Sequence, residues 1–122
     1  MNILLVEDEP LLASEISELL SSFGYSVTVT SSAEQALQTL TDSDDFDVVA
    51  SDMKMPGMSG LDFIRFARKK FFSGKAGVRF ILMSGHLDAL DPNMNLADED
   101  ISFLQKPVSG KELLARIEPG DG

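Results

Sequence analysis

The chain alternates short apolar runs with longer segments in which apolar residues recur at helical spacing. A continuous apolar run is typical of a strand buried on both faces, whereas a strictly alternating run is typical of a half-exposed strand. Residues 25–30 alternate, so we expect that strand at an edge of the sheet. The runs that we interpret as strands are residues 3–6, 25–30, 48–50, 78–83 and 101–104.

Segments with helical spacing follow most of these runs. Pro10 suits the first turn of the first helix, and Gly24 ends that helix. Ser31 and Ser32 offer the second helix a capping box in either of two registers. The apolar faces that we expect to pack on the sheet consist of Leu12, Ile16, Leu19, Leu20 and Phe23; Ala33, Ala36, Leu37 and Leu40; Phe63, Ile64, Ala67 and Phe71; and Leu113, Leu114 and Ile117.

Strands that alternate with about five helices predict an α/β fold, with a five-stranded parallel sheet and helices on both of its faces. We expect one domain over residues 1–122. The fourth helix should lie within residues 86–100, where Pro92 lacks the N–H of a helix interior and pushes Asp91 away from helical geometry. We therefore expect a fourth helix of at most about two turns, or an irregular segment.

Composition narrows the classes of function. The chain contains no cysteine, which excludes disulfides and thiol chemistry, and no apolar run approaches the roughly 20 residues that span a bilayer. Its first residues lack the basic start of a secretion signal, so we expect a cytoplasmic protein. A net charge of −10 argues against direct binding to nucleic acid. We interpret the basic cluster in residues 65–79 as a solvated helix face and loop.

Polar residues follow four of the predicted strands. Glu7 and Asp8 come after the first, Asp52 after the third, Ser84 after the fourth and Lys106 after the fifth. The carboxyl ends of parallel strands meet at one edge of a sheet, so these side chains should share a cleft. Crowded carboxylates need a cation, and oxygen ligands favour Mg²⁺. A carboxylate can also act as a nucleophile and form an aspartyl-phosphate, for which an ammonium and a hydroxyl supply positive charge and hydrogen-bond donors.

The chain resembles the receiver domain of two-component response regulators, including the small chemotaxis regulator, over essentially its whole length. The motifs that carry the resemblance are Leu5–Pro10, Asp52–Gly60, Met83–Gly85 and Lys106–Pro107. The resemblance implies a flavodoxin-like, doubly wound fold with strand order 2-1-3-4-5. It also implies phosphoryl transfer from a histidine kinase or a histidine phosphotransfer protein, followed by a change in affinity for an output protein that the sequence does not identify.

The resemblance assigns roles to individual residues. Asp52 matches the phosphoacceptor, and Ser84 and Lys106 match the hydroxyl and lysine that contact the phosphoryl group. The Mg²⁺ ligands that it implies are Asp8 and Asp52 directly, Glu7 through water and the main-chain carbonyl of Lys54. Ser84 and Phe103 match the positions coupled to switching.

Two other functions stay open at this point. An aspartyl-phosphate phosphatase generally carries a second acid two residues after its nucleophile, where this chain has Lys54. A pseudo-receiver that only binds partners would not need the full set of polar residues. We expect Gly85, His86 and Met53 at the rim of the cleft and no catalytic role for His86, since one histidine without a partner makes no catalytic set. We therefore expect no enzyme beyond the domain's own phosphorylation and dephosphorylation.

Overall fold

A computed structural model of the chain describes residues 1–85 and 100–117. The strands are Asn2–Val6 (β1), Ser26–Thr30 (β2), Val48–Asp52 (β3), Arg79–Ser84 (β4) and Ile101–Gln105 (β5). The helices are Pro10–Ser22 (α1), Ala33–Asp42 (α2), Gly60–Phe71 (α3) and Gly110–Ile117 (α4). The label α4 thus belongs to the helix that the sequence placed last. The short or irregular helix expected within residues 86–100 falls almost wholly outside the described residues.

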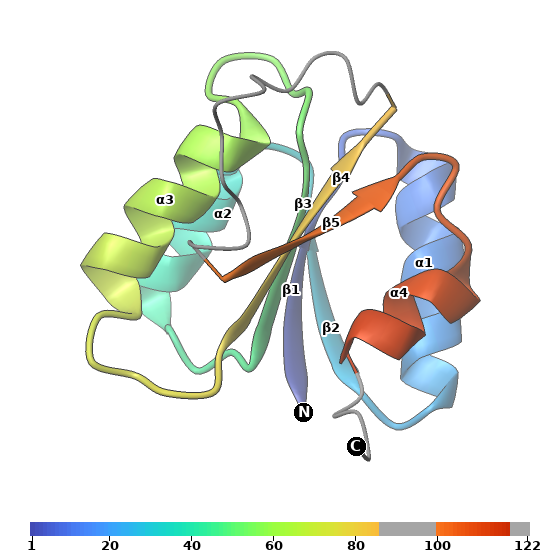
Figure 1. Cartoon of the computed structure of the whole chain (residues 1–122), viewed down its shortest axis with the longest axis horizontal. Coiled ribbons are helices and arrows are strands. Elements are labelled where there is room, and N and C mark those ends of the chain that lie inside the picture. Colours follow the sequence, from blue (N-terminus) through green and yellow to red (C-terminus); the bar gives the residue numbers. More distant parts are fainter. Residues whose placement is uncertain (86–99, 118–122) are drawn as a thin grey trace.

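The strands form one parallel sheet in the order β2-β1-β3-β4-β5, as expected, with the alternating strand β2 at an edge. Helices α2 and α3 cover one face, and α1 and α4 cover the other (Figure 1). The α/β, flavodoxin-like, doubly wound architecture is confirmed. No helix among the described residues is long and apolar enough to cross a membrane.

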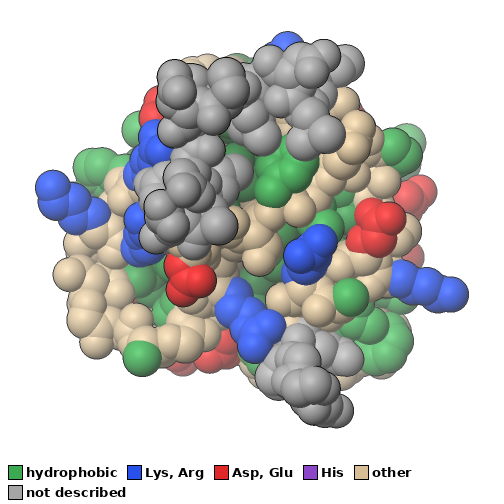
Figure 2. Space-filling model, viewed as in Figure 1, with side chains coloured by type: hydrophobic (Ala, Val, Ile, Leu, Met, Phe, Trp, Pro, Cys, Tyr) green, Lys and Arg blue, Asp and Glu red, His purple; other side chains and the backbone are tan. Residues whose placement is uncertain are grey.

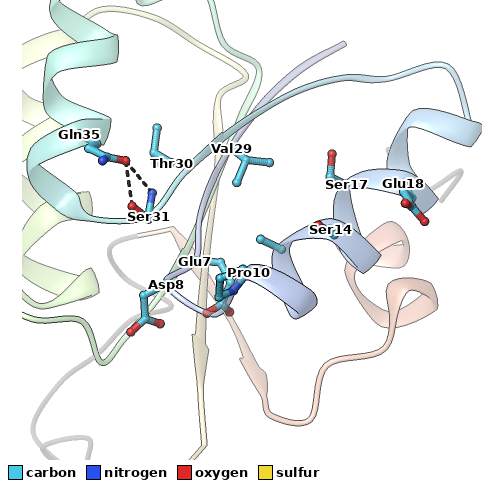
Figure 3. Close-up of a pocket in the computed structure, with 11 residues that line it drawn as sticks. Glu7, Asp8, Pro10, Ser14, Ser17, Glu18, Val29, Thr30, Ser31 and Gln35 are labelled. Carbon is cyan, nitrogen blue, oxygen red and sulfur yellow. Dashed lines mark hydrogen bonds between the residues drawn. The ribbon is translucent and has the colours of Figure 1, made fainter.

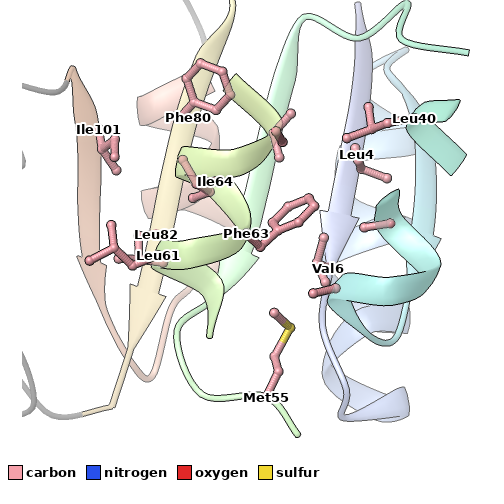
Figure 4. Close-up of a cluster of buried hydrophobic side chains, with 14 of the residues drawn as sticks. Leu4, Val6, Leu40, Met55, Leu61, Phe63, Ile64, Phe80, Leu82 and Ile101 are labelled. Atoms are coloured by element: carbon pink, nitrogen blue, oxygen red, sulfur yellow. The ribbon is translucent and has the colours of Figure 1, made fainter. Parts of the chain in front are cut away.

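Each face of the sheet has its own apolar core. On the face of α2 and α3, residues such as Leu4, Val49, Phe63 and Ile64 pack together (Figure 4). On the other face, β1, β3 and β4 contribute alternate residues that pack against α1 and α4. Strands β1, β3 and β4 are buried on both sides, which is why their sequences are continuously apolar.

Local signals set the helix starts. Pro10 is the first residue of α1, as expected. Ser32 caps α2 by accepting the N–H of Gln35 at 3.1 Å, and the Gln35 side chain accepts the N–H of Ser31 at 3.0 Å. The capping box therefore takes the register that begins at Ser32. Ser59 caps α3 in the same way by accepting the N–H of Asp62 at 3.2 Å.

One expectation about the apolar faces was wrong, for Phe23, and another held only in part, for Phe71, which packs against the core while half-buried. Phe23 is 53% exposed, because it follows the last residue of α1. Its backbone is no longer helical, so its side chain does not continue the apolar face of the helix. Phe71 is half-buried, and its neighbour Phe72 is the fully packed residue. Phe72 follows the last residue of α3, so its ring turns inward and meets Phe80 edge to face, with the ring centroids 5.7 Å apart.

Candidate functional site

Three carboxylates meet at the carboxyl edge of the sheet. Glu7 and Asp8 follow β1, and Asp52 is the last residue of β3, the strand beside it. One oxygen from each lies within 4.8 Å of the others. Glu7 is 1% exposed and Asp52 is 5% exposed, whereas Asp8 is open to solvent. The cluster thus has a buried floor and an exposed side.

Lys106, which follows β5, joins two of these carboxylates. Its ammonium lies 2.9 Å from Asp52 Oδ2 and 3.2 Å from Glu7 Oε1. The Lys106 N–H donates to the carbonyl of Ser84 at 2.7 Å, which fixes the start of the loop after β5 against the end of β4. The contact with Glu7 joins residues 99 positions apart in sequence.

Burial dominates the electrostatics of Glu7. Removal from water raises the pKa of the Glu7 carboxyl above its ordinary value of 4.5, and the charge of Asp52 raises it further. The Glu9 N–H and Lys106 oppose this rise without cancelling it. Burial lowers the pKa of the Lys106 ammonium, but the hydrogen bond and charge of Asp52, together with Glu7, outweigh burial and raise it above 10.5. The site therefore favours a charged lysine beside carboxylates that repel one another.

The chemistry of this donor set fits a hard divalent cation. Among the described residues, three carboxylates lie together and one ammonium contacts two of them, so carboxylates outnumber the positive charge. All of the candidate ligand atoms in the cluster are oxygens. The two Glu7 oxygens already accept from Lys106 and from the Glu9 N–H at 3.1 Å, which suits a ligand that acts through water. Asp8 is exposed and Asp52 lies beside it, which suits direct ligands.

The remaining predicted residues lie in different settings. Ser84 is buried at the end of β4, one residue beyond Met83, which pairs with Asp52 of β3. Lys54, whose carbonyl is an expected Mg²⁺ ligand, is exposed, and so is Gly85, as a rim residue should be. Met53, also expected at the rim, is buried, and its N–H donates to the Met83 carbonyl at 2.7 Å. Phe103 is half-buried on β5 and is among the residues that line a hollow beside α4. His86 lies outside the described residues.

A pocket of about 460 Å³ adjoins the carboxylates between α1 and the end of β2. Glu7, Asp8 and Pro10 line its side nearest the cluster, as Figure 3 shows. The sequence alone did not single out Thr30, which lies in this wall; its carbonyl accepts the N–H of Glu7 at 3.0 Å. The sequence feature that could have identified Thr30 as part of this wall is its position as the last residue of the alternating run, where it pairs with Val6 at the end of β1.

Comparison with known proteins decides the family. The family model for the "Response regulator receiver domain" matches residues 3–118. This chain belongs to that family. As a receiver domain, it is part of the two-component signalling systems. Receiver domains bind Mg²⁺ at an acidic site, and this chain has an acidic cluster of Glu7, Asp8 and Asp52.

Relatives and solved structures agree with this family. The DNA-binding response regulator MtrA of Mycolicibacterium smegmatis is 30% identical over 115 residues, which cover 94% of this chain and 48% of MtrA. The uncharacterized transcriptional regulatory protein YrkP of Bacillus subtilis is 31% identical, with 94% and 47% covered. The receiver domain thus spans about half the length of these curated relatives.

Among solved structures, a response regulator receiver domain protein from Clostridium thermocellum has a TM-score of 0.79 and 34% identity, covering 95% of this chain and 90% of its own. The receiver domain from the hybrid histidine kinase CckA has a TM-score of 0.74 and 28% identity, covering 96% of this chain and 95% of its own. These receivers come both from separate regulators and from a hybrid kinase, so the fold alone does not distinguish the two settings.

Proposed function

We propose that Asp52 accepts a phosphoryl group from the phosphohistidine of a histidine kinase or histidine phosphotransfer protein. The observation that carries this proposal is the position of Asp52: a carboxylate at a strand end, 2.9 Å from the Lys106 ammonium and within a cluster of carboxylates. An oxygen of Asp52 attacks phosphorus, and the P–N bond to the donor imidazole breaks. The imidazole nitrogen leaves with the bonding electrons and takes up a proton.

Each neighbouring side chain has a distinct part in this transfer. Lys106 provides positive charge beside the nucleophile and the incoming phosphoryl oxygens. The Ser84 hydroxyl, at the end of the neighbouring strand, is the donor for a phosphoryl oxygen. Asp8, Asp52, Glu7 through water and the Lys54 carbonyl would hold Mg²⁺, which neutralises charge on the transferring group when bound.

We infer that phosphorylation changes the affinity of this domain for an output protein. Ser84 lies on β4 and Phe103 on β5, and the two strands pair directly, so a shift of the hydroxyl toward a phosphoryl group reaches Phe103 through one strand pair. The MtrA relative is named a DNA-binding regulator, but the match covers about half of that protein. With a net charge of −10, we propose that this domain itself contacts neither nucleic acid nor membrane and acts in the cytoplasm.

The test is intact-mass measurement of the protein after incubation with Mg²⁺ and either a small phosphodonor or a phosphorylated histidine protein. We expect the wild type to gain one phosphoryl group and the Asp52→Asn variant to gain none. Asp42→Asn, at an exposed residue that ends α2, is a matched control that should label like the wild type. Label that persists on Asp52→Asn contradicts the assignment, and steady turnover of an external phosphate ester would indicate a phosphatase instead.

A further inference from the structure

Positive charge is concentrated in one part of the chain. Residues 65–79 hold six of the ten Lys and Arg and none of the twenty Asp and Glu. The rest of the chain therefore carries four Lys and Arg against twenty Asp and Glu. This basic segment begins within α3 and runs through the loop into β4. Its cations are Arg65, Arg68, Lys69, Lys70, Lys75 and Arg79.

An exposed aromatic ring lies among these cations. Phe66 is 45% exposed on the solvent side of α3. The Lys70 ammonium lies 5.5 Å from the centroid of the Phe66 ring and 5.6 Å from that of Phe71. Lys69 is exposed beside them. We call Phe66, Lys69 and Lys70 the α3 surface; Figure 2 shows Lys and Arg side chains gathered over α3 at the left of the view.

A hollow of about 990 Å³ continues this surface toward β4. Lys69 and Lys75 line it, and the buried rings of Phe72 and Phe80 form part of its wall. The Lys75 ammonium is held 3.0 Å from Asp44 and 5.7 Å from the centroid of the Phe72 ring. Lys75 is therefore a cation in a fixed place at the side of the α3 surface.

The needs of the helix explain only part of this arrangement. Cations in the last turn of α3 interact favourably with the helix dipole, and Arg68, Lys69 and Lys70 all lie there. Arg65, however, lies before the last turn of α3, where this interaction with the dipole has faded. The contact of Lys70 with the Phe66 ring stabilises the helix only slightly, and it leaves 45% of that residue exposed. Cations gathered around an exposed ring are typical of a surface that contacts another molecule.

The α3 surface lies far from the carboxylates. Helix α3 begins after the end of β3, beside Asp52, and runs back to the opposite edge of the sheet, where its last turn joins the loop into β4 (Figure 1). A partner on this surface would leave Asp52 and Lys106 accessible. The surface is therefore separate from the site of phosphoryl transfer.

We propose that the α3 surface binds an acidic, amphipathic segment of a protein partner, with carboxylates against Lys69 and Lys70 and an apolar side chain against Phe66. The exposed ring favours a protein over a phosphate backbone, which offers no apolar side chain. The acidic remainder of the chain also disfavours a long polyanion, because a duplex would extend past the α3 surface and meet negative charge. A short acidic segment contacts the basic surface alone.

The test uses the full chain and a short fluorescein-labelled helical peptide of Glu and Leu, followed by fluorescence anisotropy. We expect binding that weakens as salt increases, and a loss of about tenfold in affinity for the double variant Lys69→Glu, Lys70→Glu. Phe66→Ser should lose affinity as well, while the double variant Lys69→Arg, Lys70→Arg should retain it. Thermal melts establish that each variant is folded.

The matched control is the double variant Lys111→Glu, Arg116→Glu, which makes the same change in net charge at exposed positions of α4. It should stay within about twofold of the wild type, since the altered charges lie off the α3 surface. An equal loss of affinity in this control would show that the loss comes from the net charge of the protein and not from the α3 surface, and it would overturn the proposal. The absence of peptide binding would overturn it too, as would tighter binding of a DNA duplex or of phosphatidylserine vesicles than of the peptide.

Discussion

The substitution Gly60→Ala tests how closely the loop after Asp52 must return to β3. Gly60 begins α3, and its N–H donates to the Met53 carbonyl at 2.8 Å. A methyl group on Gly60 would overlap the carbonyl oxygen of Asp52 and lie 2.8 Å from its carbonyl carbon and 3.0 Å from Met53 Cα. These are backbone atoms, so no side-chain rotation relieves the contact.

The magnitude follows from two opposing effects. Inserting a methyl group into a packed site costs about 1–3 kcal/mol, and overlap with backbone places Gly60→Ala toward the upper end. Alanine gains at most about 1 kcal/mol over glycine in helix propensity, and less at the first residue of a helix. We expect a net loss of about 2 kcal/mol in the free energy of unfolding. For a domain of this size, that loss lowers the melting temperature by about 8 °C.

Two other glycines provide matched controls. A methyl group on Gly110 would overlap Leu19 Cδ2, the tip of a flexible side chain, so Gly110→Ala should cost under about 1 kcal/mol. Gly74 has open space around it but a φ of +83°, so Gly74→Ala should cost about 1 kcal/mol through backbone strain. Denaturant unfolding of all three variants measures these differences.

The same series separates stability from function. The expected overlap moves the main chain of Asp52, so Gly60→Ala should also phosphorylate more slowly at a temperature where it is fully folded. Gly110→Ala and Gly74→Ala should phosphorylate at the wild-type rate, because neither meets the strand that carries Asp52. The reasoning fails if Gly60→Ala unfolds like Gly110→Ala or keeps the wild-type rate.

Three further predictions concern the site. Lys106→Met leaves Glu7 and Asp52 without their ammonium, so stability at neutral pH should fall by about 3 kcal/mol. This difference in stability between the wild type and Lys106→Met should be fully present below pH 10.5. It should disappear as the pH rises through the raised pKa of Lys106, because the wild type then loses the same charge. Guanidinium unfolding measures it, and a difference that stayed constant across this pH range would contradict the ion pairs. Asp8→Asn should weaken Mg²⁺ binding and raise the melting temperature in chelator, because repulsion within the cluster falls; unchanged Mg²⁺ affinity by titration would exclude Asp8 as a direct ligand. Gly85→Leu meets no atom within 4 Å of its Cβ, so it should melt like the wild type yet slow both phosphorylation and dephosphorylation; equal rates would refute steric gating at this rim.

The pattern of apolar and polar residues was enough to predict where the functional groups lie along the sheet. An apolar run continues while a strand is buried and stops where the chain reaches the sheet edge, so the polar residues at the ends of β3 and β4 and just after β1 and β5 mark that edge. A parallel sheet then brings those ends together. The edge position of β2 followed from its alternation, whereas the full strand order depended on the family resemblance.

Periodicity was less reliable at the ends of helices. Phe23 continued an apolar spacing yet is exposed, while Phe72, just past the end of α3 and outside that spacing, is buried next to Phe80. Helical spacing holds only while the backbone is helical, and the residue where the backbone leaves the helix depends on the contacts of the following loop. The register of the box around Ser32 was open for the same reason, since both registers satisfy the local pattern.

The contacts among the site residues could not be predicted from the sequence, because they depend on how the whole chain folds. Local sequence shows that Lys106 follows a strand, but not that its ammonium reaches both Asp52 and Glu7, residues that lie 54 and 99 positions away. It also does not show that Gly60 lies against the carbonyl of Asp52. These contacts depend on strand register, loop path and side-chain rotamer together, and each is fixed by packing between segments far apart in the chain.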